Sequence, residues 1–208
     1  MQARYTAGSA EANLPCSWHT ASTSVTPEFI AGTFAAQPPL TTAEENWFQR
    51  EGVPLKNLHA PTPVRTGRVV FAGCGFEIEP YHSRSPEAEP AYLFLVTDHQ
   101  GQAQDIAVWV PDTGRLATWR QQAWALGQDS IYRPRLTDHQ CLWVWRSPWG
   151  WLRAGREGLV PIRPSALPLQ LDCAGSLVVA DTAYGKELRS MLTTATPRIL
   201  VVADGDIA

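Results

Sequence analysis

Residues 141–163 combine two side-chain types that together suit binding to nucleic acid. This segment holds four tryptophans and four arginines, with no lysine and one acid, Glu157. A guanidinium pairs with phosphate in a planar geometry, and an indole ring stacks on bases, a combination used on single strands. The candidate residues are Arg115, Trp119, Arg120, Arg146, Trp149, Arg153, Arg156 and Arg163, with Trp124, Arg133, Arg135, Trp143 and Trp145 beside them.

The charge of the chain is unevenly distributed. Residues 115–163 carry eight arginines against three acids, a net charge of +5, whereas residues 68–114 carry two basic and seven acidic groups, a net charge of −5. The whole chain has a net charge of −3. We therefore expect no general affinity for nucleic acid, but a local contact with an anionic partner stays open.

A structural role for the same residues is the alternative, and we favour it. Tryptophan is usually a core or interface residue, and arginine stems can lie along a core or pair with the acidic residues of segment 77–112. Trp143 and Trp145 share one face of their expected strand, and a core needs such a face. Composition alone leaves both roles open.

Acidic residues follow two apolar stretches near the C-terminus. The stretch SLVVAD ends in Asp181, and ILVVADGD supplies Asp204 and Asp206. This pattern resembles the Toprim domain of primases and topoisomerases, in which acids after two strands bind magnesium. The resemblance implies a metal-dependent enzyme acting on phosphate esters, with Asp181, Asp204 and Asp206 as magnesium ligands.

The residues themselves favour another role for these acids, so our first expectation is no cofactor. Asp181 stands where a helix begins, and its carboxylate is expected to accept hydrogen bonds from its own backbone amides. If the strands are parallel, their carboxyl ends bring Arg146, Arg163 and Asp181 to one edge, together with Asp204 and Asp206. Such an edge is where ligands bind in open parallel sheets.

No complete catalytic signature is present. The chain lacks G-x-S-x-G, P-loop and G-x-G-x-x-G motifs, and its four cysteines include no C-x-x-C pair that would suggest zinc. The stretch WLRAGREGLVPI followed by LVVADTAYGKELRSML is similar to uncharacterised accessory proteins of bacterial mobile elements, a resemblance that implies no activity. We expect a non-enzymatic accessory protein with a protein or nucleic-acid partner.

The expected setting is the cytoplasm. No stretch approaches the roughly 20 apolar residues that cross a bilayer, and the first residues lack the charged start and apolar run of a signal peptide. Reduced thiols are the simplest explanation of four cysteines without a recognisable spacing.

The elements that position these residues form one α/β domain after an N-terminal extension. Residues 1–67 are the extension, with two short helices and a proline-rich loop, and residues 68–208 are the domain. The expected strands are 68–76, 92–97, 105–110, 142–145, 159–162, 177–180 and 199–203. Strands 92–97 and 105–110 form an antiparallel hairpin through a turn at Asp98.

Helices are expected between the later strands. Leu116, Trp119, Ala123 and Leu126 share one helical face, so residues 115–126 are expected to be helical. Ser147 and Pro148 are typical of a helix start, and Asp181 begins a helix that runs to Leu192. Strands alternating with short helices favour a mixed, partly parallel sheet that the hairpin extends. The unit 142–162 is expected to be a parallel strand–helix–strand crossover.

Overall fold

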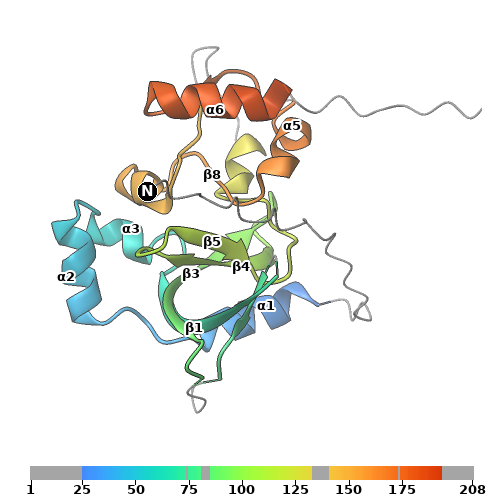
Figure 1. The fold of residues 1–208 in the computed structure, drawn as a ribbon. Coiled ribbons are helices and arrows are strands. Elements are labelled where there is room, and N and C mark those ends of the chain that lie inside the picture. The colour runs from blue at the N-terminus through green and yellow to red at the C-terminus, as the bar shows by residue number, and fades with distance from the viewer. Residues whose placement is uncertain (1–24, 74, 81–84, 133–140, 173, 194–208) are drawn as a thin grey trace, which may run out of the picture.

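The computed structural model describes residues 25–73, 75–80, 85–132, 141–172 and 174–193. These residues form an α/β structure in which helices cover both faces of a curled, antiparallel, five-stranded sheet. Figure 1 shows α1 below this sheet, and α5 and α6 above it. Two smaller sheets of two strands each lie in the upper part.

Three N-terminal helices pack against the sheet. They are α1 (Pro27–Ala35), α2 (Thr42–Arg50) and α3 (Leu55–His59). A capping box begins α2, because the Thr41 side chain accepts from the Glu44 amide and the Glu44 carboxylate accepts from the Thr41 amide. This pattern of a threonine followed three residues later by a glutamate is one that the sequence alone can predict.

The large sheet has the strand order β2-β1-β3-β4-β5, and every pairing in it is antiparallel. The predicted hairpin of β3 and β4 is confirmed, and its turn is held by the Asp98 carboxylate, which accepts from the amides of Gln100 and Gln102. The strands are β1 (Arg65–Ala72), β2 (Gly75–Ile78), β3 (Glu89–Thr97), β4 (Ala103–Val110) and β5 (Arg115–Thr118).

Strand β4 is buried on both faces. Ile106 and Val108 point to the side covered by α1, where they pack with Ile30 and Phe34. Trp109 points to the opposite side and packs with the residues of α2 and α4. The alternation of a strand therefore supplies two hydrophobic cores at once.

Two local predictions for the sheet are wrong. The expected single strand 68–76 is a hairpin, because Ala72 of β1 pairs with Gly75 of β2 and Gly73 between them has a φ of 55°. The left-handed conformation at Gly73 turns the chain at this point. Strand β2 then runs beyond the expected end of the strand, through Glu77 to Ile78.

The expected helix 115–126 is also wrong. Residues Arg115–Thr118 form β5, and Ala125–Leu126 form the short strand β6. Between them the chain folds around the fully buried carboxylate of Asp105, which accepts from the amides of Ile106, Arg120, Gln122 and Ala123. A charged carboxylate is a stronger acceptor for the amides of this loop than the carbonyl oxygens of a helix would be. These long-range hydrogen bonds therefore override the helical spacing of the apolar residues in 115–126.

The remaining elements form the upper part of the molecule. They are η1 (Gln128–Tyr132), β7 (Leu142–Trp143), α4 (Pro148–Arg153), β8 (Val160–Pro161), η2 (Pro164–Ala166), α5 (Leu167–Gln170), β9 (Leu177–Val178) and α6 (Thr182–Thr193). The predicted crossover is confirmed by a parallel bridge from Val144 to Leu159 across α4. Strand β7 also pairs in parallel with β9, whereas β8 pairs with β6 in antiparallel fashion.

The α/β class is confirmed, but the single mixed sheet is not. The parallel pairs are short and separate from the five-stranded sheet, because β7 and β9 have only two residues each. The expected strand 199–203 lies outside the described residues.

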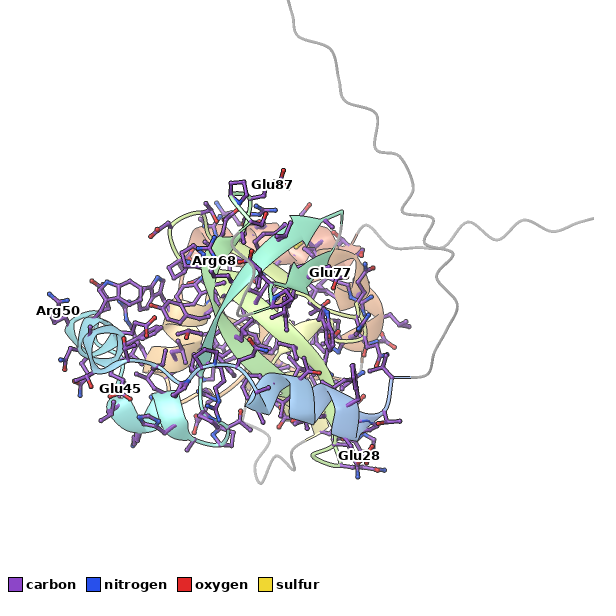
Figure 2. All side chains as sticks on the ribbon, turned by 90° about the horizontal axis from the view of Figure 1, so that it is seen from below. Glu28, Glu45, Arg50, Arg68, Glu77 and Glu87 are labelled. Atoms are coloured by element: carbon purple, nitrogen blue, oxygen red, sulfur yellow. The ribbon has the colours of Figure 1, made fainter. Side chains whose placement is uncertain are left out.

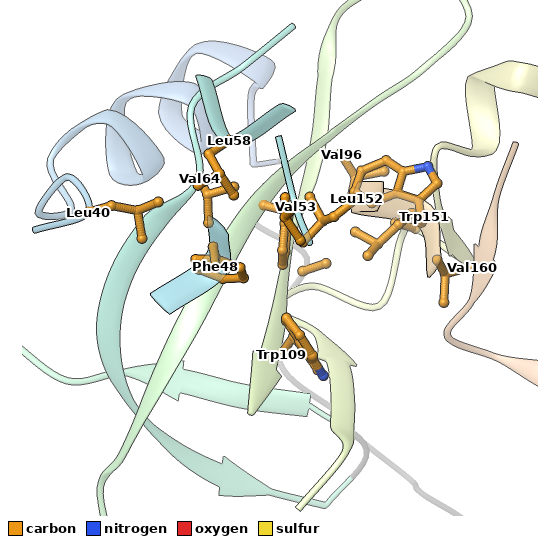
Figure 3. Packing of buried hydrophobic residues seen from close by; sticks show 14 residues of the cluster. Leu40, Phe48, Val53, Leu58, Val64, Val96, Trp109, Trp151, Leu152 and Val160 are labelled. Carbon is orange, nitrogen blue, oxygen red and sulfur yellow. The ribbon is translucent and has the colours of Figure 1, made fainter. Parts of the chain in front are cut away.

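The buried residues between the sheet and α2, α3 and α4 form a continuous core. Figure 3 shows Phe48, Leu58, Trp109, Trp151 and Leu152 packing together in it. A neighbouring core joins the upper strands to α5 and α6. Charged side chains of the lower part, such as those labelled in Figure 2, lie around the periphery. None of the described helices has the length and apolar character needed to cross a membrane.

Candidate functional site

A groove lies beyond the carboxyl ends of β7 and β9, where α4 and α6 begin. Its volume is about 570 Å³, and it is lined by residues of two segments, 145–154 and 180–184. The groove brings together four of the candidate residues, namely Arg146, Trp149, Arg153 and Asp181. It therefore unites residues from both sequence patterns, the arginine–tryptophan segment and the acid after a strand.

Parallel pairing explains why these residues meet. Strands β7 and β9 run side by side in the same direction, so the residues that follow them emerge at one edge. Arg146 follows the first strand and Asp181 the second, so these two of the residues predicted to converge at this edge do meet. Arg163, predicted at the same edge, does not line the groove, because β8 pairs with β6 and not with β7 or β9. Asp181 also caps α6, because its Oδ1 accepts from the Tyr184 amide at 2.6 Å.

The Trp145 ring forms a rigid part of the groove wall. It stacks on Trp143 with the ring centroids 5.2 Å apart and an angle of 11° between the planes. Its Nε1 donates to the carbonyl oxygen of Glu157 at 2.7 Å. A Cβ added at Gly150 would lie 2.6 Å from the Trp145 ring, so the indole rests directly on the backbone of α4.

Trp149 forms a second aromatic wall of the groove, and other tryptophans pack against its ring. Its ring meets Trp109 edge-on at 4.9 Å and Trp47 edge-on at 5.1 Å. Trp149 and Trp145 are both half-buried, so each ring is supported by the core and still presents surface to the groove. Rigid rings of this kind lose little conformational entropy when they bind a ligand.

Two exposed arginines flank these rings. Arg146 Nη2 lies 3.1 Å from Glu187 Oε2, and its guanidinium lies 5.8 Å from the centre of the Tyr184 ring. Arg153 Nε donates to the Glu51 carbonyl oxygen at 2.8 Å, and its guanidinium lies 5.5 Å from the centre of the Trp149 ring. The side chains of Arg146 and Arg153 are 61% and 49% exposed, so both cations are accessible to an anion.

Tyr184 supplies a neutral hydroxyl to the groove. Burial, and then the negative charge of Glu187, raise the pKa of Tyr184 to about 12. The hydroxyl therefore stays protonated at physiological pH and donates weakly to the Trp145 carbonyl oxygen at 3.5 Å. The described residues that line the groove include no histidine, cysteine or lysine.

Three candidate residues lie on other elements and do not line the groove. Arg115 begins β5, pairs with Glu89 at 2.9 Å and covers the Phe71 ring at 3.6 Å. Trp119 lies in the loop after β5 and stacks on Phe29, with Arg120 packed 3.8 Å above the Trp119 ring.

Arg156 and Arg163 are structural rather than exposed. Arg156 is 6% exposed and donates to the carbonyl oxygens of Asn57 and Thr62, and burial lowers the pKa of its guanidinium to about 10. Arg163 is half-buried, with an Nε that has no hydrogen-bond partner. Trp124 and Trp151 belong to the cores, so the expectation of a structural role holds for these side chains. Arg133 and Arg135 lie outside the described residues.

The magnesium site of the Toprim resemblance stays a prediction. Asp204 and Asp206 lie outside the described residues, so their position relative to Asp181 is not part of the structure. Within the described part of the chain, no group of three or more histidine, cysteine, aspartate or glutamate residues could hold a metal ion.

Sequence reasoning missed Tyr184 and the two glutamates that pair with the groove arginines. Tyr184 could have been found from its place in the first turn of the helix after Asp181. Glu51 carries no such signal, because 102 residues separate it from Arg153. Comparison of the chain with protein-family models, curated proteins and solved structures found no match.

Proposed function

We propose that this protein is a non-enzymatic binding protein that acts through a macromolecular partner, and that the partner is single-stranded nucleic acid. The observation that supports this proposal is the groove itself, whose lining combines the rings of Trp145 and Trp149 with the exposed cations Arg146 and Arg153. The proposed setting is the cytoplasm.

The chemistry of a single strand fits these four side chains. Unpaired bases are flat and can stack on a half-buried indole, and the phosphates between them carry the charge that a guanidinium binds. A duplex is a poorer fit, because its bases are stacked on one another and do not offer their faces. Tyr184 and Asp181 add a donor and an acceptor at the end of the groove for sugar or base groups.

The test is the affinity for a fluorescently labelled, single-stranded oligonucleotide, measured by anisotropy at several salt concentrations. We expect micromolar binding at low salt that weakens steeply as salt rises, because binding releases counterions. The double variant Arg146→Ala/Arg153→Ala should lose two phosphate contacts, so the negative slope of log K against log salt should become less steep by about 1.4.

Arg115→Ala is the matched control. Arg115 belongs to the same basic segment and is also an exposed, singly paired arginine, but it lies on β5. Equal losses in Arg115→Ala and in the groove variants would mean that the net charge of the segment, and not the groove, drives binding. Absence of binding at low salt would refute the proposal.

A further inference from the structure

The cations of the groove are occupied by carboxylates of the protein itself. Glu187 of α6 pairs with Arg146 at 3.1 Å, and the Glu51 carboxylate at the end of α2 lies 3.9 Å from Arg153 Nη2. A third carboxylate, that of Asp181, belongs to the lining itself, whereas the two glutamates reach the arginines from outside it. Two arginines and three carboxylates together have no net positive charge, although a phosphate ligand would be attracted by one.

We propose that Glu187 and Glu51 are internal competitors that set the affinity and selectivity of the groove for phosphate, an inference that rests on the proposed function. Each glutamate occupies its arginine while the groove is empty, and an incoming phosphate must displace it. The exchange is feasible because both pairs are exposed, with 43% and 48% of the glutamate side chains accessible. Exposed ion pairs contribute little free energy, so a phosphate can replace one partner.

The two pairs differ in how completely the glutamate controls its arginine. Arg146 is bound by the Glu187 carboxylate, whereas Arg153 also donates to the backbone carbonyl oxygen of Glu51 at 2.8 Å. The bond from Arg153 to the backbone of Glu51 does not depend on the Glu51 side chain. The Glu51 carboxylate is also farther from its arginine, at 3.9 Å, than the Glu187 carboxylate is from Arg146, at 3.1 Å. Glu187 is therefore the stronger competitor, and its removal should have the larger effect.

Strands and single nucleotides are affected to different degrees by this competition. A mononucleotide displaces one glutamate and gains one cation, so its net gain is small. A strand that reaches both arginines displaces both glutamates and makes the second exchange within an existing complex, at a high effective concentration. Removal of the two glutamates should therefore strengthen strand binding more than mononucleotide binding.

The experiment compares wild type with Glu187→Gln, Glu51→Gln and the double variant in the oligonucleotide titration, and adds a mononucleotide as a second ligand. Glutamine keeps the size of the side chain and removes its charge. We expect Glu187→Gln to tighten strand binding by about two- to five-fold and Glu51→Gln by less. Strand binding should tighten by a larger factor than mononucleotide binding in the double variant, because a strand displaces both glutamates and a mononucleotide only one.

Glu89→Gln is the matched control, because Glu89 pairs with Arg115 at 2.9 Å on the large sheet. Removal of any negative charge strengthens binding to a polyanion slightly, and this variant measures that general effect. Groove variants that bind no more tightly than Glu89→Gln would overturn the inference while the proposed function stands. Failure of wild type and every variant to bind would overturn both.

Discussion

Replacement of Asp105 by asparagine should destabilise the fold by about 3–6 kcal/mol, because the carboxylate organises the loop between β5 and β6. Its Oδ1 accepts from the amides of Ile106 at 2.8 Å and Arg120 at 2.9 Å. Its Oδ2 accepts from the amides of Gln122 at 2.8 Å and Ala123 at 3.1 Å. All four donors therefore depend on one buried side chain.

The magnitude follows from the two donors that asparagine cannot serve. Asparagine keeps one oxygen, and its NH₂ group then faces two backbone N–H groups in a site where Asp105 is 0% exposed. A hydrogen bond to a charged group contributes about 1.5–3 kcal/mol, and two are lost. The Ala123 amide has little access to water, since Ala123 is fully buried, so solvent does not replace its lost bond, whereas Gln122 is an exposed residue and places the loss nearer the lower end of this range.

The assay is urea unfolding followed by far-ultraviolet circular dichroism, with the free energy of unfolding taken by linear extrapolation. Asp98→Asn is the matched control, because Asp98 also accepts from two backbone amides, but through one oxygen and at an exposed turn. Asparagine is well suited to such a turn, so the control should stay within about 1 kcal/mol of wild type. A loss of less than about 1 kcal/mol in Asp105→Asn would refute the argument.

Three further predictions follow from other parts of the structure. Gly158→Ala should prevent folding, because the new Cβ would lie 2.2 Å from a carbonyl oxygen of β7. Gly101→Ala is its control: Gly101 has a similar φ of 78° but open space around it, so this variant should lose only about 1 kcal/mol of stability, and soluble yield and melting temperature distinguish the two. Magnesium or manganese should leave the melting temperature unchanged, and a rise that is lost in Asp181→Asn would instead support the Toprim-like alternative. Burial raises the pKa of Tyr184 and of Tyr92 from 10.0 to about 12, so between these pH values the folded state holds protons that the unfolded state has lost. The free energy of unfolding should therefore fall as pH rises from 10 to 12. A free energy of unfolding that does not change over this range would contradict the prediction.

Features that depend on neighbouring residues could be predicted from the sequence. The Thr41 capping box, the start of α4 after Ser147 and the Asp181 cap of α6 each depend on bonds or conformations within four residues. The hairpin of β3 and β4 belongs to the same group, because alternation and the Asp98 turn lie next to each other in the chain. The meeting of Arg146 and Asp181 at one edge was predicted differently, from the general rule that residues after parallel strands emerge at the same edge.

Features that depend on distant residues were decided by the tertiary structure. The helical spacing of Leu116 and Trp119 did not produce a helix, because Asp105 supplies hydrogen bonds from 15 or more residues away. The sequence likewise could not separate Arg153 from Arg156. They are three residues apart in one basic segment, yet the first is exposed beside the groove and the second is buried.

The sequence by itself therefore determined that this chain carries aromatic and cationic side chains in one segment, with helix starts and turns at recognisable positions. Only the tertiary structure decided which of these side chains are free to bind. Arg156 is buried because carbonyl oxygens of Asn57 and Thr62, 99 and 94 residues earlier, accept its hydrogen bonds. Arg153 stays exposed because α2 offers it a single backbone oxygen at the surface. Burial depends on such long-range contacts, and local sequence does not encode them.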